Sequence, residues 1–254
     1  MTTFIFDIDG TISKNGAPVD MLICDKIASL LNKHRIIFAS ARAVRDILPL
    51  LPDKLHTATF VGCNGGIIWK EGKFISVEYF RKADAKRIIH YLKSHSLPYM
   101  INGKWKYSVS DFDHEFYRYL RALSSEETTE DELLLSGVTK ILVLNSIISE
   151  DCKSYLNKLR IKNRIEKYIK ENMFDITPHY CDKYFALKSL GVDFSNCVSF
   201  GNDTNDHLML ENSRVSVYVG EHKNFKGANY YCSESDIISV INEIVSNNKP
   251  TNKL

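Results

Sequence analysis

The segment Phe4-Ile5-Phe6-Asp7-Ile8-Asp9-Gly10-Thr11 predicts a strand that leads directly into a chemical site. A short apolar run followed by a glycine turn is typical of a buried strand. Two carboxylates at the end of such a strand are unfavourable unless a cation neutralises them. Carboxylate oxygens suit Mg2+, which commonly binds substrate phosphate as well, and a carboxylate can itself attack phosphorus. The segment therefore indicates metal-assisted phosphoryl transfer; the alternative is a strand with an Asp-Gly turn whose acids face solvent.

The composition is that of an ordinary globular protein and excludes several classes of function. The chain has 254 residues and a formal net charge of +2 without a long basic stripe, so we expect no nucleic-acid partner. No apolar run has membrane-spanning length and the N-terminus shows no signal-peptide pattern, so we expect a cytoplasmic protein without membrane contact. The six cysteines contain no Cys-x-x-Cys pair and are expected to stay reduced. The sequence contains no signal for an oligomeric state.

Strand and helix patterns alternate at both ends of the chain, which predicts an α/β fold. Near the N-terminus, predicted helices at 20–34 and 44–51 separate predicted strands at 4–6, 36–39 and 59–61. Near the C-terminus, predicted strands at 198–200 and 215–219 alternate with predicted helices at 182–190, 206–210 and 235–245. This order is typical of a doubly wound, parallel, Rossmann-like sheet, in which ligands bind beyond the carboxyl ends of the strands.

The middle of the chain follows a different pattern, which predicts an α+β insertion over residues 81–178 between the two halves of the sheet domain, 1–80 and 179–254. Hairpin signals, such as Asn102-Gly103 between apolar runs, mix there with helical patterns. The densest positive segment, from Lys158 to Lys170, is expected to be a solvated helix face or a turn.

Three further polar signals lie at the ends of predicted strands or the starts of helices. Ser40 can donate a hydrogen bond to a phosphate oxygen or cap the following helix. Arg42, two residues later, either contacts substrate or pairs with Asp46 one turn on. Lys183 can bind phosphate and neutralise developing charge, although a single lysine is more often a surface residue. The run Gly201-Asn202-Asp203-Thr204-Asn205-Asp206 suits a cation site, the alternative being a capped strand-to-helix loop.

Together these segments resemble the four motifs of the haloacid dehalogenase-like (HAD) hydrolase superfamily. Asp7-x-Asp9-Gly10-Thr11 is similar to the first motif, Ser40 to the second, Lys183 to the third, and the run that ends at Asp206 to the fourth. Asp9 and Ser40 are 31 positions apart, too few for a cap domain, whereas Lys183 follows Ser40 by 143 positions. A cap in that second gap resembles the Cof-type phosphatases of subfamily IIB, so the insertion would be a C2-type α+β cap and the remainder a HAD-like catalytic core.

The resemblance implies an Mg2+-dependent phosphatase of small phosphorylated metabolites, by default sugar phosphates, that works through an aspartyl phosphate. It implies that Asp7 is the nucleophile and that Asp9 protonates the leaving alkoxide and then activates water. Phosphoryl oxygens would be held by Ser40 and Lys183, with Gly10, Thr11, Ala41 and Asn205 as further phosphate-binding residues. Mg2+ would be bound by Asp7, the backbone carbonyl of Asp9, Asn202 and Asp206.

One position departs from the family pattern, because Asn202 stands where the fourth motif has its first aspartate. An amide oxygen can bind a hard cation but contributes no charge, so we expect weaker Mg2+ binding unless Asp203 compensates. This departure favours one alternative function, a catalytically silent or regulatory HAD-fold binding protein. A phosphomutase or phosphotransferase is another alternative, although Asp9 favours hydrolysis because water must be activated.

Overall fold

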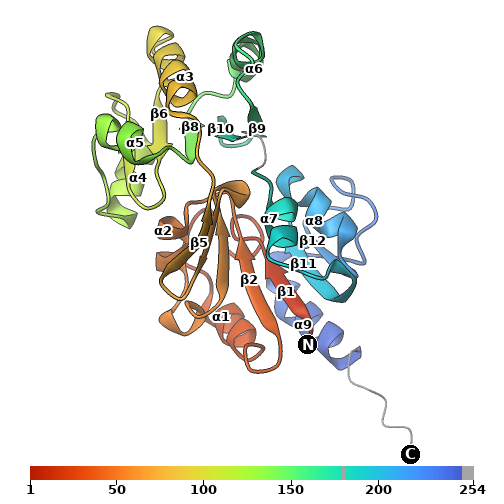
Figure 1. The fold of residues 1–254 in the computed structure, drawn as a ribbon. Helices are drawn as coiled ribbons and strands as arrows, with labels where there is room; N and C mark the ends of the chain where they lie inside the picture. The colour runs from red at the N-terminus through yellow and green to blue at the C-terminus, as the bar shows by residue number, and fades with distance from the viewer. Residues whose placement is uncertain (179–180, 248–254) are drawn as a thin grey trace, which may run out of the picture.

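The computed structural model describes residues 1–178 and 181–247, which form two layered parts, each built around one sheet (Figure 1). Within these residues the larger sheet has eight strands and the smaller has five. The larger sheet takes its strands from both ends of the chain, and the smaller sheet takes its strands from the middle. The predicted α/β core with an α+β insertion is therefore confirmed.

The strands of the larger sheet are β1 (Thr3–Phe6), β2 (Arg35–Ala39), β3 (Thr59–Gly62), β4 (Ile67–Lys70), β5 (Lys73–Val77), β11 (Cys197–Gly201), β12 (Val215–Val219) and β13 (Tyr230–Cys232). Their order across the sheet is β13-β12-β11-β1-β2-β3-β4-β5. Neighbouring strands from β13 to β3 are parallel, as predicted, whereas β4 and β5 extend one edge as an antiparallel hairpin. Because β1 lies between β11 and β2, the first segment of the chain reaches the centre of the sheet.

Helices cover both faces of the larger sheet because side chains alternate along each strand. Phe4 and Phe6 point to one face, where they pack with α1 (Met21–Ala28), α2 (Val44–Ile47) and α9 (Ile237–Asn247). Ile5 points to the other face and packs with α7 (Lys183–Ser189) and α8 (His207–Asn212). This is the doubly wound arrangement that the order of elements predicts.

The smaller sheet is an antiparallel layer with two chemically different faces. Its strands are β6 (Tyr99–Asn102), β7 (Tyr107–Val109), β8 (Lys140–Val143), β9 (Asn163–Tyr168) and β10 (Met173–Pro178), in the order β7-β6-β8-β10-β9. One face is apolar and packs with α3 (Lys82–Ser94), α5 (Glu130–Ser136) and α6 (Ser149–Lys158). The other face carries Met100 and Leu142, which pack with α4 (Glu115–Leu123), and also Lys140 and Asp175. The polar residues on this second face point to a site rather than to a core.

One local expectation from the sequence is wrong and another is confirmed. The basic segment that was expected as a helix face or turn contains β9, because its backbone pairs with β10 and charge pattern does not oppose an edge strand. The hairpin predicted at Asn102-Gly103 is confirmed, because β6 and β7 pair antiparallel, with Asn102 opposite Tyr107 and the chain reversing over residues 103–106. The Asn102 side chain is buried and accepts a hydrogen bond from Arg45 at 2.9 Å.

The carboxyl ends of the parallel strands face the smaller sheet (Figure 1). Since β5 ends at Val77 and β10 at Pro178, we propose residues 81–178 as the cap and residues 1–80 and 179–254 as the core. Residues 179 and 180, at the second junction, lie outside the described residues. In the described part of the chain no helix is both long and apolar enough to cross a membrane.

Candidate active site

The first segment of the site is the loop that follows β1. The Asp7 N–H still donates to the Phe200 carbonyl of β11 at 3.0 Å, so Asp7 is held at the edge of the sheet. Its side chain is buried, whereas that of Asp9 is partly exposed. Gly10 has a φ of 75°, and a Cβ there would lie 2.2 Å from Asn202 Nδ2. Glycine at this position therefore allows the first segment to approach the last one closely.

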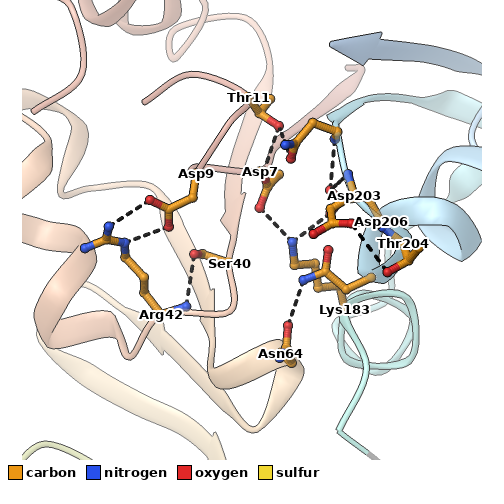
Figure 2. A network of polar contacts seen from close by, with 12 residues as sticks. Asp7, Asp9, Thr11, Ser40, Arg42, Asn64, Lys183, Asp203, Thr204 and Asp206 are labelled. Carbon is orange, nitrogen blue, oxygen red and sulfur yellow. Dashed lines mark hydrogen bonds and ion pairs between the residues drawn. The ribbon is translucent and has the colours of Figure 1, made fainter. Parts of the chain in front are cut away.

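Lys183 joins Asp7 to Asp206 at the buried side of the site (Figure 2). Its Nζ lies 2.7 Å from Asp7 Oδ1 and 2.7 Å from Asp206 Oδ1. Burial opposes the ammonium charge, but the carboxylates of Asp206 and Asp7 outweigh it and raise the pKa of Lys183. Burial, reinforced by Asp206 and opposed by Lys183, raises the pKa of Asp7. Two carboxylates and one ammonium leave this buried group with one negative charge in excess, which favours a bound cation.

Asn202 and Thr11 lie on the other side of Asp7. Thr11 Oγ1 donates to Asp7 Oδ2 at 2.8 Å and lies 3.1 Å from the Asn202 side chain. The Asn202 amide can present either end to Asp7, because rotation exchanges its oxygen and nitrogen. With the nitrogen inward, it donates to Asp7 Oδ2 at 3.1 Å and to the Asp9 carbonyl at 3.0 Å. With the oxygen inward, Asn202 Oδ1 lies beside Asp7 Oδ2 and the Asp9 carbonyl oxygen, so three acceptor oxygens come together.

The oxygen-inward arrangement fits a small divalent cation. Mg2+ binds oxygen at about 2.0–2.1 Å in octahedral geometry, so neighbouring ligand oxygens lie about 2.9 Å apart. The inward Asn202 atom is 3.1 Å from Asp7 Oδ2 and 3.0 Å from the Asp9 carbonyl, which is close to that spacing. Within the described residues no group of three or more His, Cys, Asp or Glu side chains forms a metal site. A cation here would therefore depend on the carbonyl and amide oxygens as well as on Asp7.

Asp206 is fully buried and bonded within the protein through both oxygens. In addition to Lys183, it accepts the backbone N–H of Asn202 at 3.0 Å and that of Asp203 at 3.2 Å. Asp203 in turn accepts the N–H of Thr204 at 2.7 Å, and the two acids form a capping box that holds this loop. Asp206 thus positions the backbone beside Asn202, and its direct binding to metal stays a prediction.

Ser40 lies at the end of β2 with its hydroxyl proton available. Its Oγ accepts the Arg42 N–H at 3.1 Å, and the residue is 1% exposed. Because the backbone uses an accepting lone pair, the hydroxyl can donate to an anion. Ser40 is therefore suited to the phosphoryl contact that the sequence assigns to it.

The other predicted phosphate-binding residues are engaged with protein groups. The Gly10 N–H donates to the Ser13 carbonyl at 2.8 Å and the Thr11 N–H to the Ile8 carbonyl at 3.2 Å. The Ala41 carbonyl accepts a hydrogen bond from Lys140 at 2.9 Å. The phosphate contacts of Gly10, Thr11 and Ala41 stay predictions.

Arg42 pairs with Asp9, so pairing with Asp46, one of the two alternatives left open by the sequence, does not occur. Arg42 Nε and Nη2 donate to the two Asp9 oxygens at 2.6 and 2.7 Å (Figure 2). Burial opposes the guanidinium charge, but the Asp9 carboxylate outweighs it and raises the pKa of Arg42. Arg42 Nη1 donates to the hydroxyl of Tyr119, which comes from α4 of the insertion. Asp46 pairs instead with Arg45, its neighbour in α2.

A second polar network joins Asn64, in the turn that follows β3, to the smaller sheet. Asn64 Nδ2 donates at 3.0 Å both to Asp175 Oδ2 and to the Tyr168 hydroxyl. Lys140 Nζ lies 3.1 Å from Asp175 Oδ1, and both side chains are buried. Burial raises the pKa of Asp175, although Lys140 opposes this. Asn205 donates to Asn64 Oδ1 at 3.0 Å, and within the described residues Asn205 Oδ1 has no hydrogen-bond partner.

These residues surround a cavity of about 590 Å³ between the two sheets. The motif residues line the cavity from the larger sheet, and the insertion contributes the polar side chains of Lys140, Tyr168 and Asp175. The insertion also contributes an apolar set, which consists of Met100, Phe116, Leu120, Leu123, Leu142 and Met173. The structure thus brings the predicted residues Asp7, Asp9, Gly10, Ser40, Ala41, Asn202 and Asn205 to one cavity, with Thr11, Lys183 and Asp206 bonded behind them.

The site residues that the insertion contributes were not predicted from the sequence. Asp175 had a recognisable signal, because an acid stands between Phe174 and Ile176 in an apolar strand pattern. Lys140 had a weaker signal, as a charged residue directly before the apolar run from Ile141 to Leu144. Tyr119 had none, since its contact with Arg42 depends on how the insertion sits on the sheet.

Comparisons with known proteins agree with this architecture. A family model described as haloacid dehalogenase-like hydrolase matches residues 4–237. A phosphoglycolate phosphatase of Methanobrevibacter smithii is 20% identical over 246 residues, which cover 90% of this chain and 91% of that protein.

Solved structures share the fold at low sequence identity. A haloacid dehalogenase-like hydrolase from Bacteroides thetaiotaomicron has a TM-score of 0.81 at 16% identity, covering 96% of this chain and 99% of that one. A HAD subclass IIB sugar phosphatase has a TM-score of 0.73 at 15% identity, covering 97% and 98%. The family model matches residues 4–237, a range that includes all four motif segments, so this chain belongs to the haloacid dehalogenase-like hydrolases.

Proposed function

We propose that this chain is an Mg2+-dependent phosphatase that hydrolyses small phosphorylated metabolites through an aspartyl-phosphate intermediate, with sugar phosphates as the default class. The observation that carries the proposal is the buried Asp7–Lys183–Asp206 group, whose excess negative charge lies beside an oxygen cluster suited to a divalent cation. The cavity over this group has the size of a small-metabolite site. The relative named phosphoglycolate phosphatase and the sugar phosphatase of similar fold support the same class.

The residues present can carry out both halves of the reaction. An Asp7 oxygen attacks phosphorus and the bond to the ester oxygen breaks, while Asp9, which has taken a proton from solvent, gives that proton to the leaving oxygen. Asp9 then takes a proton from a water that attacks phosphorus, and the bond between Asp7 and phosphorus breaks to release phosphate. Ser40 donates its free hydroxyl proton to a phosphoryl oxygen. Lys183 uses two of its three N–H donors on Asp7 and Asp206, which leaves one for the phosphoryl group.

Asp7, the Asp9 carbonyl and Asn202 would hold Mg2+, and Asp206 would support them through the backbone of Asn202. The bound cation would neutralise the excess charge, so that an anionic phosphate can approach the Asp7 carboxylate. We also propose a cytoplasmic location, which the six free cysteines support because a reducing compartment keeps thiols unpaired.

The test is phosphate release from a panel of phosphorylated metabolites, measured with Mg2+ and with a chelator. We expect release that depends on Mg2+ and is lost in Asp7→Asn, with the fold of that variant checked by circular dichroism. Release that persists in the chelator, or in Asp7→Asn, would contradict the metal or the nucleophile assignment.

A catalytically silent binding protein is the second candidate, and one observation favours it. With its nitrogen inward, the Asn202 amide satisfies Asp7 and Asp9 without a cation. Such a protein would bind phosphorylated ligands but release no phosphate from any member of the panel at saturating Mg2+. A phosphotransferase would instead pass the phosphoryl group to an added acceptor alcohol faster than to water.

A further inference from the structure

The ion pair between Arg42 and Asp9 conflicts with the work proposed for Asp9. The guanidinium binds both carboxylate oxygens, at 2.6 and 2.7 Å (Figure 2). Such a bidentate contact stabilises the carboxylate and occupies the oxygens that must exchange a proton with the leaving group. Within the described residues, Arg42 supplies the only side-chain hydrogen bonds to this carboxylate. The pair must therefore separate during each catalytic cycle.

When the pair separates, Asp9 is the partner that can move. Arg42 is restrained because Nη1 donates to the Tyr119 hydroxyl at 2.8 Å, and that hydroxyl donates to the Gly16 carbonyl at 3.0 Å. The Arg42 backbone N–H is also bonded to Ser40. The Arg42 side chain is 17% exposed, whereas that of Asp9 is 41% exposed. The guanidinium therefore keeps its place in the cavity while the carboxylate turns toward the ester oxygen.

A guanidinium left without its carboxylate in this cavity is unfavourable, because a desolvated charge that loses its partner is strongly destabilising. The buried cations nearby already have partners, since Lys183 is bonded to Asp7 and Asp206, and Lys140 to Asp175. A substrate anion that takes the place of the Asp9 carboxylate would restore the pair. That anion would lie beside Asp9, and hence close to the ester oxygen.

We propose that the substrate is a phosphorylated hydroxy acid, with a carboxylate one or two carbons from the ester oxygen, and that Arg42 binds this carboxylate in exchange for Asp9. This inference rests on the proposed phosphatase function and narrows its small phosphorylated metabolites to phosphorylated hydroxy acids, in place of the default sugar phosphates. Arg42 already presents both donors of its fork to a carboxylate, a geometry that a neutral sugar hydroxyl does not use. Binding of the substrate acid and release of Asp9 for acid–base work are then one event.

The kinetic test compares phosphate esters that differ in a single carboxylate. One pair is 2-phosphoglycolate and ethyl phosphate, and another is glycerate 2-phosphate and glycerol 2-phosphate. We expect kcat/KM to favour the acidic member of each pair by roughly 10- to 100-fold, the range for a charged bidentate contact. In Arg42→Gln the preference should fall to within about threefold, because the fork is lost. In Lys170→Gln, which removes an exposed cation from the same cavity, the preference should remain.

A binding test separates this inference from turnover. Asp9→Asn removes the carboxylate that occupies Arg42, so a substrate acid no longer has to displace it. Measured by calorimetry with Mg2+ present in the Asp7→Asn background, which does not turn over, the preference for 2-phosphoglycolate over ethyl phosphate should be about tenfold larger with Asp9→Asn than with Asp9 retained. The double variant Asp9→Asn/Arg42→Gln should lose this preference.

The two proposals fail in different ways. Release of phosphate from both members of each pair at similar rates, with Arg42→Gln reducing both equally, would overturn the substrate class and leave the phosphatase intact. Failure of every ester to react would overturn the phosphatase, while the Asp9→Asn binding preference would still test the Arg42 exchange. A preference that survives in Arg42→Gln would also overturn the exchange. A preference for 6-phosphogluconate over glucose 6-phosphate as large as that for the short acids would refute the position given to the carboxylate.

Discussion

Replacing Asn202 by Asp should tighten Mg2+ binding, because it adds charge to the cluster that faces Asp7. In the wild-type protein the buried Asp7–Lys183–Asp206 group carries one excess negative charge, and Asn202 adds none. Asn202→Asp would place a second excess charge about 3 Å from Asp7 Oδ2, where the amide head now lies. Without metal the two carboxylates repel each other, and a divalent cation removes that repulsion.

The size of the effect follows from this spacing and from the partial exposure of Asn202. Two unit charges about 3 Å apart interact by roughly 1.4 kcal/mol at the dielectric constant of water and about 5.5 kcal/mol at an effective value of 20. Asn202 is half-buried, so we take about 1.4–3 kcal/mol. Since 1.4 kcal/mol is a factor of ten, the Kd for Mg2+ should fall by about tenfold to a hundredfold.

Calorimetric titration of the chelator-treated protein with Mg2+ measures this change directly. Asn15→Asp is the matched control, because it adds the same charge at an exposed position of the same cavity and should change Kd by less than about threefold. Asn202→Asp should also lower the Tm in chelator, since the amide donors to Asp7 and to the Asp9 carbonyl are lost. A Kd no lower than that of Asn15→Asp would refute the assignment of Asn202 to the metal.

Three further outcomes follow from buried groups of the site. Burial raises the pKa of Asp7 above 3.8, so the protonated side chain stabilises the fold below that pH and this stability is lost as the pH rises through the raised pKa. In chelator, Asp7→Asn should therefore flatten the decline of Tm with rising pH, which thermal melts across the pH range measure. Asp175→Asn leaves Lys140 without its charged partner and should cost about 3–5 kcal/mol of unfolding free energy in urea; a loss below about 1 kcal/mol would contradict the buried pair. Gly10→Ala combines a strained φ with a Cβ 2.2 Å from Asn202 Nδ2, so phosphate release should fall by at least about tenfold; unchanged release would contradict the close approach of these loops.

Most of the fold was predictable because its signals are local. The alternation of short apolar runs with helical patterns placed β1, β2, β3, β11 and β12 correctly, and their order required a parallel sheet. The predictions failed where pairing partners decide the conformation. The segment with β9 is polar and reads as a solvated helix or turn, yet it forms a strand because β10 supplies its hydrogen bonds. The Asn102-Gly103 signal, by contrast, is local, and the hairpin of β6 and β7 that it predicts forms there.

The candidate site likewise has features that the sequence predicts and features that it does not. The motif residues could be named from the sequence, because the carboxyl ends of parallel strands meet at one edge and any polar residue there is brought to the same place. The contacts of these residues could not be predicted. Arg42 had equally plausible partners in Asp46 and in a substrate, and its true partner Asp9 is 33 positions away. The contributions of Lys140, Tyr119 and Asp175 depend on how a separate layer sits over that edge. Local sequence therefore determines which chemistry the core can offer, whereas packing of the insertion against the core determines which groups are paired, buried and left to meet a substrate.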